Sequence, residues 1–279
     1  MTSTSSASPA DIPSPRARPR LYAHRGAAVE LPENTLPSFR LALELGADAL
    51  ETDAHLTSDG HVVLSHDPTG ARMCGIAKPI AEATLAEVQS WDAGALFLDA
   101  RGERAQAGKG YRIPTLAEVL RELPGVRFNV DAKSRHPEMV PRILEVVNRA
   151  GASDRVLLAS FHSGTLAKVR RLGYRGQTGL GQAEVVRLLV LPTRVLGAPR
   201  FRLGGAAAQI PYRIYGIDLG TRAVVAKCHA LGLAVHYWTV NDPALATRLL
   251  EVGADAIMTD DPRLVGPAVR SFNPLRPGR

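Results

Sequence analysis

A pair of acidic side chains, Glu51 and Asp53, has the types and the spacing that suggest chemistry. The apolar residues Ala47, Ala49 and Leu50 precede the pair and indicate a β-strand that enters a core. Residues two apart on a strand project from the same face, so the carboxylates would lie side by side. Buried neighbouring carboxylates repel each other unless a proton or a cation lies between them, and Mg²⁺ and Ca²⁺ prefer carboxylate oxygens. The alternative is a surface strand with solvated acids.

Asp131 and Lys133 repeat this spacing on a different predicted strand. If both strands line one cavity, three carboxylates and one ammonium group meet there. Three carboxylates suit a Mg²⁺ or Ca²⁺ site with open positions for substrate or water, and Lys133 would face an anionic ligand. The alternative is a simple ion pair at a loop. The sequence has no His-x-x-x-His motif or cysteine pair, which argues against structural zinc.

Two histidines, His24 and His66, each follow a short predicted strand. A single histidine at a strand end is more often structural than catalytic. Two histidines beside a metal site can act as general base and general acid, because the pKa of imidazole lies near neutrality. The other six histidines have no such context and are interpreted as structural or exposed.

Three further side chains could bind or shape a ligand. Arg25 offers a bidentate fork for a phosphate or a carboxylate, and Glu33 is a candidate partner that would orient it. Trp238, at the end of a predicted strand, could wall a pocket or could lie in the core.

The composition is that of a globular protein. The chain has 279 residues, of which 45% are hydrophobic, and no apolar run is long enough for a membrane-spanning helix. Residues 1–19 are rich in Ser, Ala, Pro and Arg without an apolar segment, so we expect a disordered tail and a cytoplasmic protein. Residues 269–279 form a second tail. Cys74 and Cys228 do not indicate a disulfide framework.

The net charge of +7 raises the question of nucleic-acid binding. The first 20 residues contribute +2 and the last 15 contribute +3, which leaves +2 for the body of the chain. No basic face interleaved with aromatic residues is evident. We therefore expect no nucleic-acid partner.

Short apolar segments alternate with amphipathic ones, as in parallel βαβ units. Strands are expected around Glu51 and at 21–24, 61–64, 126–131, 155–159, 177–180, 206–210, 234–238 and 256–258. Helices are expected at 36–43, 85–91, 115–123, 137–150, 164–172, 221–231 and 243–252. Glycines at 46, 151, 173, 232 and 253 each stand between a helix and the next strand, where a left-handed residue ends the helix.

The chain also contains a repeat. Residues 46–53 (GADALETD) and 253–260 (GADAIMTD) share six of eight residues. About eight strand–helix units over about 250 residues favour an α/β fold, a closed (β/α)₈ TIM barrel over 20–268, rather than an open doubly wound sheet. The chemistry of such barrels lies at the C-terminal ends of the strands. The predicted elements place there His24, Glu51, Asp53, Asp131, Lys133, Trp238 and Asn241.

Two segments depart from the regular pattern. Residues 68–111 follow His66 and Asp67 and are rich in small residues, which predicts a small insertion or a long active-site loop after the second histidine rather than a second domain. Residues 182–203 are apolar and basic and predict a buried or packing helix. A membrane-surface patch is the alternative for this segment.

The order and spacing of a set of motifs resemble the glycerophosphodiester phosphodiesterase family. The resemblance runs from about residue 21 to residue 267, and the motifs are specific when taken together. They are His24-Arg25-Gly26, Pro32-Glu33-Asn34-Thr35, Glu51-x-Asp53, His66-Asp67, Asp131-x-Lys133, Trp238-Thr239-Val240-Asn241 and the stretch from Gly253 to Pro262.

The resemblance implies a barrel with a small insertion, a divalent cation and a set of site residues. The chain differs from the family in two places. The third acidic position is Asp131, where the family often has Glu. The Leu-x-Arg-Thr-Thr motif that is common in the family after the second histidine is missing. The implied residues are Glu51, Asp53 and Asp131 as metal ligands, His24 and His66 as catalytic acid and base, Arg25 and Lys133 as phosphate ligands, and Glu33 and Trp238 as orienting or pocket residues.

We therefore expect a metal-dependent phosphodiesterase that uses Mg²⁺ or Ca²⁺ and hydrolyses a small glycerophosphodiester to sn-glycerol 3-phosphate and an alcohol. One histidine would deprotonate the nucleophile and the other would protonate the leaving alkoxide. One alternative is a lysophospholipase D or sphingomyelinase D-like hydrolase, which segment 182–203 suggests. The other is a phosphodiester-binding protein without activity.

Overall fold

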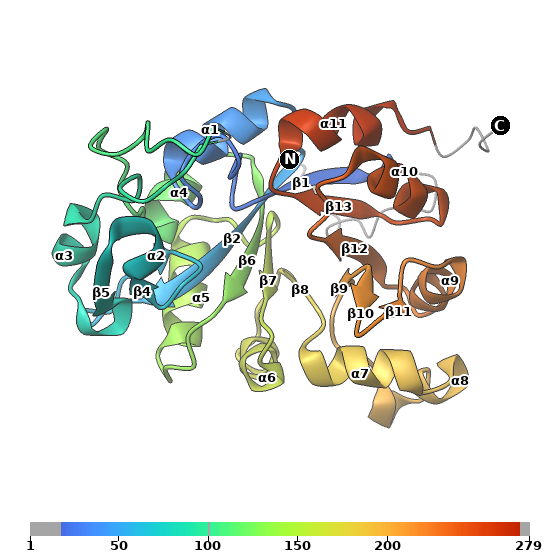
Figure 1. Cartoon of the computed structure of the whole chain (residues 1–279). Helices are drawn as coiled ribbons and strands as arrows, with labels where there is room; N and C mark the ends of the chain where they lie inside the picture. The colour runs from blue at the N-terminus through green and yellow to red at the C-terminus, as the bar shows by residue number, and fades with distance from the viewer. Residues whose placement is uncertain (1–17, 100, 274–279) are drawn as a thin grey trace, which may run out of the picture.

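The barrel is formed by eight parallel strands that connect in a nearly closed ring (Figure 1). The structure is a computed structural model that describes residues 18–99 and 101–273, so most of the two predicted tails lies outside the described residues. An isolated parallel bridge between Gly179 and Ala207 joins the ends of the ring, and the predicted TIM barrel is confirmed. In spatial order the strands are β8 (Gln177–Thr178), β7 (Val156–Ala159), β6 (Arg127–Ala132), β2 (Ala49–Leu56), β1 (Arg20–His24), β13 (Ala256–Thr259), β12 (Ala234–Trp238) and β9 (Ala207–Pro211).

Helices surround this ring (Figure 1). The helices predicted between barrel strands are present with small shifts at their ends, except the one predicted over 182–203. Helix α11 is an addition that the sequence analysis did not predict. Gly266 and Pro267 interrupt the helical sequence pattern of α11. Pro262 at the start of the helix and the Asp261 N-cap still favour a helix there. The barrel helices are α1 (Leu36–Glu44), α4 (Leu116–Glu122), α5 (Met139–Arg149), α6 (Ser163–Arg171), α7 (Gln182–Val190), α9 (Arg222–Ala230), α10 (Pro243–Glu251) and α11 (Pro262–Ser271).

The repeated octapeptide has the same structural role in both copies. Each copy begins with a glycine at positive φ, +87° in the first and +105° in the second, which ends the preceding helix. The third residue of each copy is an aspartate that accepts a hydrogen bond from the backbone N–H at the start of a neighbouring strand. Asp48 Oδ2 lies 2.8 Å from Leu21 N, and Asp255 Oδ2 lies 2.7 Å from Val235 N.

The segment after His66 contains its own small elements and its own core. The side chains of Cys74, Ile80, Val88 and Trp91 are buried together there. In the sequence the segment follows β3 (Val62–Leu64), which pairs antiparallel with β2. Its elements are β4 (Thr69–Gly70), α2 (Ala71–Cys74), β5 (Ile76–Pro79), the 3₁₀ turn η1 (Ile80–Glu82) and α3 (Leu85–Ser90), the last of which is the predicted helix 85–91.

The single helix predicted over 182–203 is wrong in its second half. Helix α7 ends at Val190, and α8 (Thr193–Leu196) and the 3₁₀ turn η2 (Pro199–Phe201) follow it. A residue before proline avoids the helical region, and Leu191 before Pro192 is extended with ψ of 143°. No helix of the described residues is long and apolar enough to cross a membrane.

One short hairpin projects after β9. It consists of β10 (Arg213–Ile214) and β11 (Ile217–Asp218), which pair antiparallel. All six residues from 213 to 218 are exposed.

The aromatic contact between Phe39 and Phe128 joins α1 to β6 in the larger hydrophobic core. The rings are edge to face with centroids 6.4 Å apart, and both side chains are almost completely buried. We expect Phe128→Ala to lower the free energy of unfolding by about 3–5 kcal/mol, because it removes this contact and leaves a cavity. Urea unfolding followed by circular dichroism measures the change. Leu98→Ala, at a residue that is 56% exposed, is the control and should cost less than about 0.5 kcal/mol; equal losses in both variants would contradict the prediction.

Candidate active site

One cavity of about 330 Å³ collects eight of the nine predicted site residues at the C-terminal side of the barrel. The ninth, Glu33, lies outside the cavity lining and contacts Arg25, with Glu33 Oε1 3.4 Å from Arg25 Nη1. The structure therefore brings the predicted residues together, while their roles stay predictions. The eight lining residues are His24, Arg25, Glu51, Asp53, His66, Asp131, Lys133 and Trp238.

The register between β2 and β6 arranges the acids. It pairs Glu51 with Asn129 and Asp53 with Asp131, so four oxygen-bearing side chains lie together on the inner face of two neighbouring strands. All four are at most 6% exposed. Sequence reasoning missed Asn129, although its position two residues before Asp131 is the same signal that had identified Asp53.

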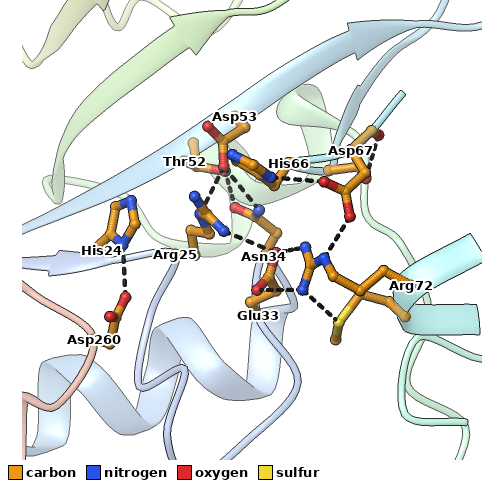
Figure 2. Close-up of polar contacts among 12 residues, drawn as sticks. His24, Arg25, Glu33, Asn34, Thr52, Asp53, His66, Asp67, Arg72 and Asp260 are labelled. Carbon is orange, nitrogen blue, oxygen red and sulfur yellow. Dashed lines mark hydrogen bonds and ion pairs between the residues drawn. The ribbon is translucent and has the colours of Figure 1, made fainter. Parts of the chain in front are cut away.

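Asp53 is the best neutralised of the three acids. Lys133 Nζ lies 3.0 Å from Asp53 Oδ1 and 2.7 Å from Asp131 Oδ2. Arg25 Nε lies 3.1 Å from Asp53 Oδ2 (Figure 2). Burial alone would raise the pKa of Asp53, but the two positive charges outweigh it and hold the pKa below its usual value.

Glu51 and Asp131 are less well compensated. Burial, and then the charge of Asp53, raises the pKa of Glu51 to about 8. Burial also raises the pKa of Asp131, and the nearby Lys133 opposes this effect only in part. Both carboxyl groups therefore favour an added proton or cation in their surroundings.

The oxygens that lack partners fit a hard divalent cation. In the part of the chain that the structure describes, the buried side-chain oxygen atoms without a hydrogen-bond partner are Glu51 Oε2, Asn129 Oδ1 and Asp131 Oδ1, all on β2 and β6. Across residues 18–99 and 101–273, no three His, Cys, Asp or Glu side chains converge closely enough to form a metal site as they stand. Instead, the ammonium group of Lys133 lies between two of the carboxylates. The donor set is nevertheless one that Mg²⁺ and Ca²⁺ prefer.

His24 is held by a carboxylate that the sequence analysis did not select. Its Nδ1 lies 2.6 Å from Asp260 Oδ1 (Figure 2), and Asn241 Nδ2 donates to the other oxygen of Asp260 at 2.7 Å. The Nε2 atom lies 3.7 Å from Glu51 Oε2. Burial lowers the pKa of His24, but Glu51 and Asp260 outweigh it and raise the pKa above its usual value. The repeat could have identified Asp260, because it is the counterpart of Asp53.

His66 is held through a chain of contacts that passes through the inserted segment. Its Nδ1 lies 2.8 Å from Asp67 Oδ1, and the other oxygen of Asp67 accepts from Arg72 Nε (Figure 2). Arg72 also places its two terminal nitrogens on the Glu33 carboxylate, at 2.6 and 3.1 Å. Glu33 in turn contacts Arg25, so this chain connects a catalytic candidate to a phosphate-binding candidate. No spacing in the sequence had indicated Arg72.

The remaining lining of the cavity is largely apolar. Trp238 packs edge to face against Phe161 with centroids 5.8 Å apart, and Lys133 Nζ lies 5.3 Å from the Phe161 ring. The cavity thus has a charged part and an apolar part. Aliphatic residues of the apolar part are Leu180, Val185, Ile210, Ile214 and Met258.

Two imidazoles and two cationic side chains in one cavity form an arrangement that can carry out acid–base chemistry on an anionic ester. The fold and the cavity together define a TIM-barrel hydrolase, with its site at the usual end of the barrel.

Comparison with known proteins identifies the family. The model of the glycerophosphoryl diester phosphodiesterase family matches residues 24–264. The chain is 31% identical to a glycerophosphodiester phosphodiesterase of Caldanaerobacter subterraneus over 256 residues, which covers 90% of this chain and 97% of the relative. It is 32% identical over 244 residues to the probable glycerophosphodiester phosphodiesterase 2 of Mycobacterium tuberculosis, covering 85% and 86% of the two chains.

A solved structure supports the same assignment. An Oleispira antarctica phosphodiesterase in complex with the product sn-glycerol-3-phosphate matches with a TM-score of 0.74 and 27% identity, covering 91% of this chain and 97% of that one. The chain therefore belongs to the glycerophosphoryl diester phosphodiesterase family. It is an enzyme, a phosphoric diester hydrolase, and we do not retain the alternative of a binding protein without activity.

The raised pKa of Glu51 predicts a pH-dependent stability of the metal-free protein. The folded state keeps this proton up to about pH 8, whereas the unfolded state releases it near the usual value of 4.5. The free energy of unfolding should therefore fall as the pH rises between these values, by at most about 1.4 kcal/mol per pH unit from this group. Glu51→Gln should remove this part of the decline in urea unfolding series with a chelator present. Glu44→Gln, at an exposed residue, is the control, and an unchanged slope in Glu51→Gln would refute the assignment.

Proposed function

We propose that the protein hydrolyses glycerophosphodiesters and releases sn-glycerol 3-phosphate and an alcohol. The observation that carries the proposal is the pair of imidazoles, His24 and His66, each bound through Nδ1 to a carboxylate and each lining the cavity that contains Arg25 and Lys133. The product bound in the Oleispira antarctica phosphodiesterase supports this choice of substrate.

The two imidazoles would move the protons of the reaction. A carboxylate at Nδ1 favours the tautomer with the proton on that atom, which leaves Nε2 to take or give a proton. One histidine accepts a proton from the nucleophile, which is water or the glycerol 2-hydroxyl, as the new bond to phosphorus forms. The other gives a proton to the leaving alkoxide as its bond to phosphorus breaks. If the 2-hydroxyl attacks, water then opens the cyclic phosphate with the roles reversed.

Arg25 and Lys133 would hold the phosphate. An ammonium group has three N–H donors, and Lys133 directs contacts to two carboxylates, so one donor is left for a phosphate oxygen. The guanidinium of Arg25 forms ion pairs with Asp53 through Nε and with Glu33 through Nη1, and its remaining N–H groups can face the ligand. Both positive charges also oppose the negative charge that develops on phosphorus oxygens during cleavage.

The residues that would hold a divalent cation, Mg²⁺ or Ca²⁺, are Glu51, Asp53 and Asp131, and the amide oxygen of Asn129 adds a fourth donor. A bound cation supplies positive charge that polarises the phosphodiester. The unpaired buried oxygens on β2 and β6 and the raised pKa of Glu51 support this assignment.

A second candidate substrate is a lysophospholipid, cleaved by the same groups in a lysophospholipase D or sphingomyelinase D-like reaction. The apolar part of the cavity, with Phe161, Ile210 and Ile214, favours it, because an acyl chain could lie there. Turnover of lysophosphatidylcholine against glycerophosphocholine, measured as choline release, separates the two candidates.

The first test concerns the histidines and the cation. We expect His24→Ala and His66→Ala each to slow release of glycerol 3-phosphate from glycerophosphocholine by about 10²–10⁴-fold, because each removes a proton-transfer group. His61→Ala, at an exposed histidine outside the cavity, should keep the wild-type rate. A chelator should abolish activity and added Mg²⁺ or Ca²⁺ should restore it. Full activity with the chelator would refute the metal assignment, and full activity of either alanine variant would refute the acid–base pair.

The second test concerns Arg72 as a positioning residue. We expect Arg72→Ala to lower kcat about 10–100-fold, because Asp67 then no longer holds His66 firmly and Glu33 loses its bidentate partner. Arg72→Lys, which keeps the charge but not the fork, should recover only part of the loss. Arg112→Ala, at a similarly exposed arginine paired with Glu118, is the control. A kcat that is unchanged in Arg72→Ala would contradict the role.

A further inference from the structure

Exposed apolar side chains gather at one side of the cavity mouth. Ten large hydrophobic residues are exposed in the described part of the chain, and five of them lie here: Phe161, Val186, Ile214, Tyr215 and Ile217. We call these five residues the apolar rim. Phe161 and Ile214 line the catalytic cavity, and Val186 lines a shallow groove that also includes Phe161. Apolar surface concentrated in this way indicates an interaction site.

The tip of the apolar rim is a turn whose sequence is unfavourable for folding. Strands β10 and β11 pair Ile214 with Ile217, and Tyr215 and Gly216 between them have φ of +46° and +83°. Two-residue turns with positive φ at both positions favour Asn-Gly, and a bulky side chain is strained there. Tyr215 is 98% exposed and has no hydrogen-bond or ring partner within residues 18–99 and 101–273. Contacts in that part of the chain therefore do not offset the strain, which points to a role outside the fold.

Positive charge accompanies the apolar rim. Arg213 is exposed at the base of the hairpin, and Arg135 lines the shallow groove. On α7, Arg187 directly follows Val186 of the apolar rim. Asp218 on the hairpin is neutralised by Arg248 at 3.2 Å. A surface of this composition attracts an anionic and partly apolar partner.

We propose that the apolar rim docks the mouth of the barrel onto a lipid bilayer that contains anionic headgroups. A tyrosine side chain is stable at the level of the headgroups, where its ring contacts apolar material and its hydroxyl contacts water. The isoleucine, valine and phenylalanine side chains of the rim would enter the outer layer of the acyl region. The arginines would add attraction to anionic lipids.

The arrangement favours a bilayer over a second copy of the chain. The apolar rim comes from a loop, a helix and a projecting hairpin, and three of its residues line one or both of two cavities, so it is not a flat face. A protein partner must match such a surface in shape over a standard interface, whereas lipids adapt to it. Two copies would also bring clusters of arginines together, which is unfavourable.

Docking in this orientation has a consequence for the substrate, and this consequence alone rests on the proposed function. The cavity would open into the interfacial layer, where the phosphodiester group of a single-chain lipid lies. The phosphodiester could then reach Arg25 and Lys133 while the acyl chain stays along Ile210 and Ile214. The chemistry thus points to an amphiphilic phosphodiester presented at a surface.

The experiment uses vesicle sedimentation with a double substitution that keeps the turn. Tyr215→Asn/Ile217→Thr creates the residue pair that such a turn prefers and removes the apolar tip, so loss of folding is not expected. The full chain should sediment with vesicles of phosphatidylcholine and phosphatidylglycerol, and less with phosphatidylcholine alone. The double variant should bind about tenfold more weakly or worse, since two exposed apolar side chains are lost.

The control and the overturning results are defined in the same assay. Leu172→Ser, at a residue that is 51% exposed at the far end of α6, should bind like the wild type. The proposal is overturned if the wild-type chain does not sediment with anionic vesicles, or if the double variant binds equally well. It is also overturned if the wild type forms dimers that the double substitution abolishes while vesicles are not bound. Vesicle binding requires no turnover, and hydrolysis of glycerophosphocholine by the double variant is measured separately. Failure of the proposed hydrolase function can therefore be distinguished from failure of membrane docking.

Discussion

Burial of three carboxylates on two neighbouring strands is the constraint on which the rest of the site depends. The pairing of β2 with β6 places Glu51, Asp53 and Asp131 on one inner face, where water cannot solvate them fully. Buried charge of one sign requires compensation nearby. Arg25 and Lys133 supply part of this compensation. The raised pKa of Glu51 shows that they do not fully compensate the negative charge of its carboxylate. The buried carboxylates thus account both for the cationic residues beside them and for the proposal that a divalent cation binds there.

The two histidines of the cavity are held by distant parts of the chain. His24 receives its carboxylate from a residue 236 positions later, through the end of the last barrel strand. His66 receives its carboxylate from its own neighbour, Asp67, and the inserted segment fixes that neighbour through Arg72. The barrel therefore orients one imidazole, and the insertion orients the other. Substitutions in the inserted segment that alter the contact of Arg72 with Asp67 would therefore change how His66 is held, and they would leave the contact of His24 with Asp260 in place.

Local patterns in the sequence were sufficient for the barrel and for most of the cavity. Spacing of two on a strand identified Glu51 and Asp53, and glycines such as Gly46 marked the helix ends correctly. Arg72 was missed because its contacts arise only from the tertiary fold, whereas the repeat offered a signal for Asp260 that was not used. The break at Pro192 was visible in the sequence, but the strong apolar pattern around it was given more weight than the proline. The roles of the site residues came from resemblance to a family, and spacing alone would have left several of them open.

The barrel has fewer backbone hydrogen bonds at one joint between strands than at the others, and this joint is where thermal motion can open the ring. Seven of the joints between neighbouring strands are regular ladders, whereas β8 and β9 meet through an isolated bridge between Gly179 and Ala207, with hydrogen bonds from Leu180 N to Ala207 O and from Ala206 N to Thr178 O. Side chains on both sides of this joint still share one hydrophobic core, because Leu180 after β8 packs in the same cluster as Ala208 and Ile210 of β9. The backbone of a closed ring opens most easily at the joint with the fewest hydrogen bonds. Thermal widening there would enlarge the cavity beside Leu180 and Ile210 and leave the pairing of β2 with β6 undisturbed, so the room for an apolar ligand group could vary while the acid cluster keeps its geometry.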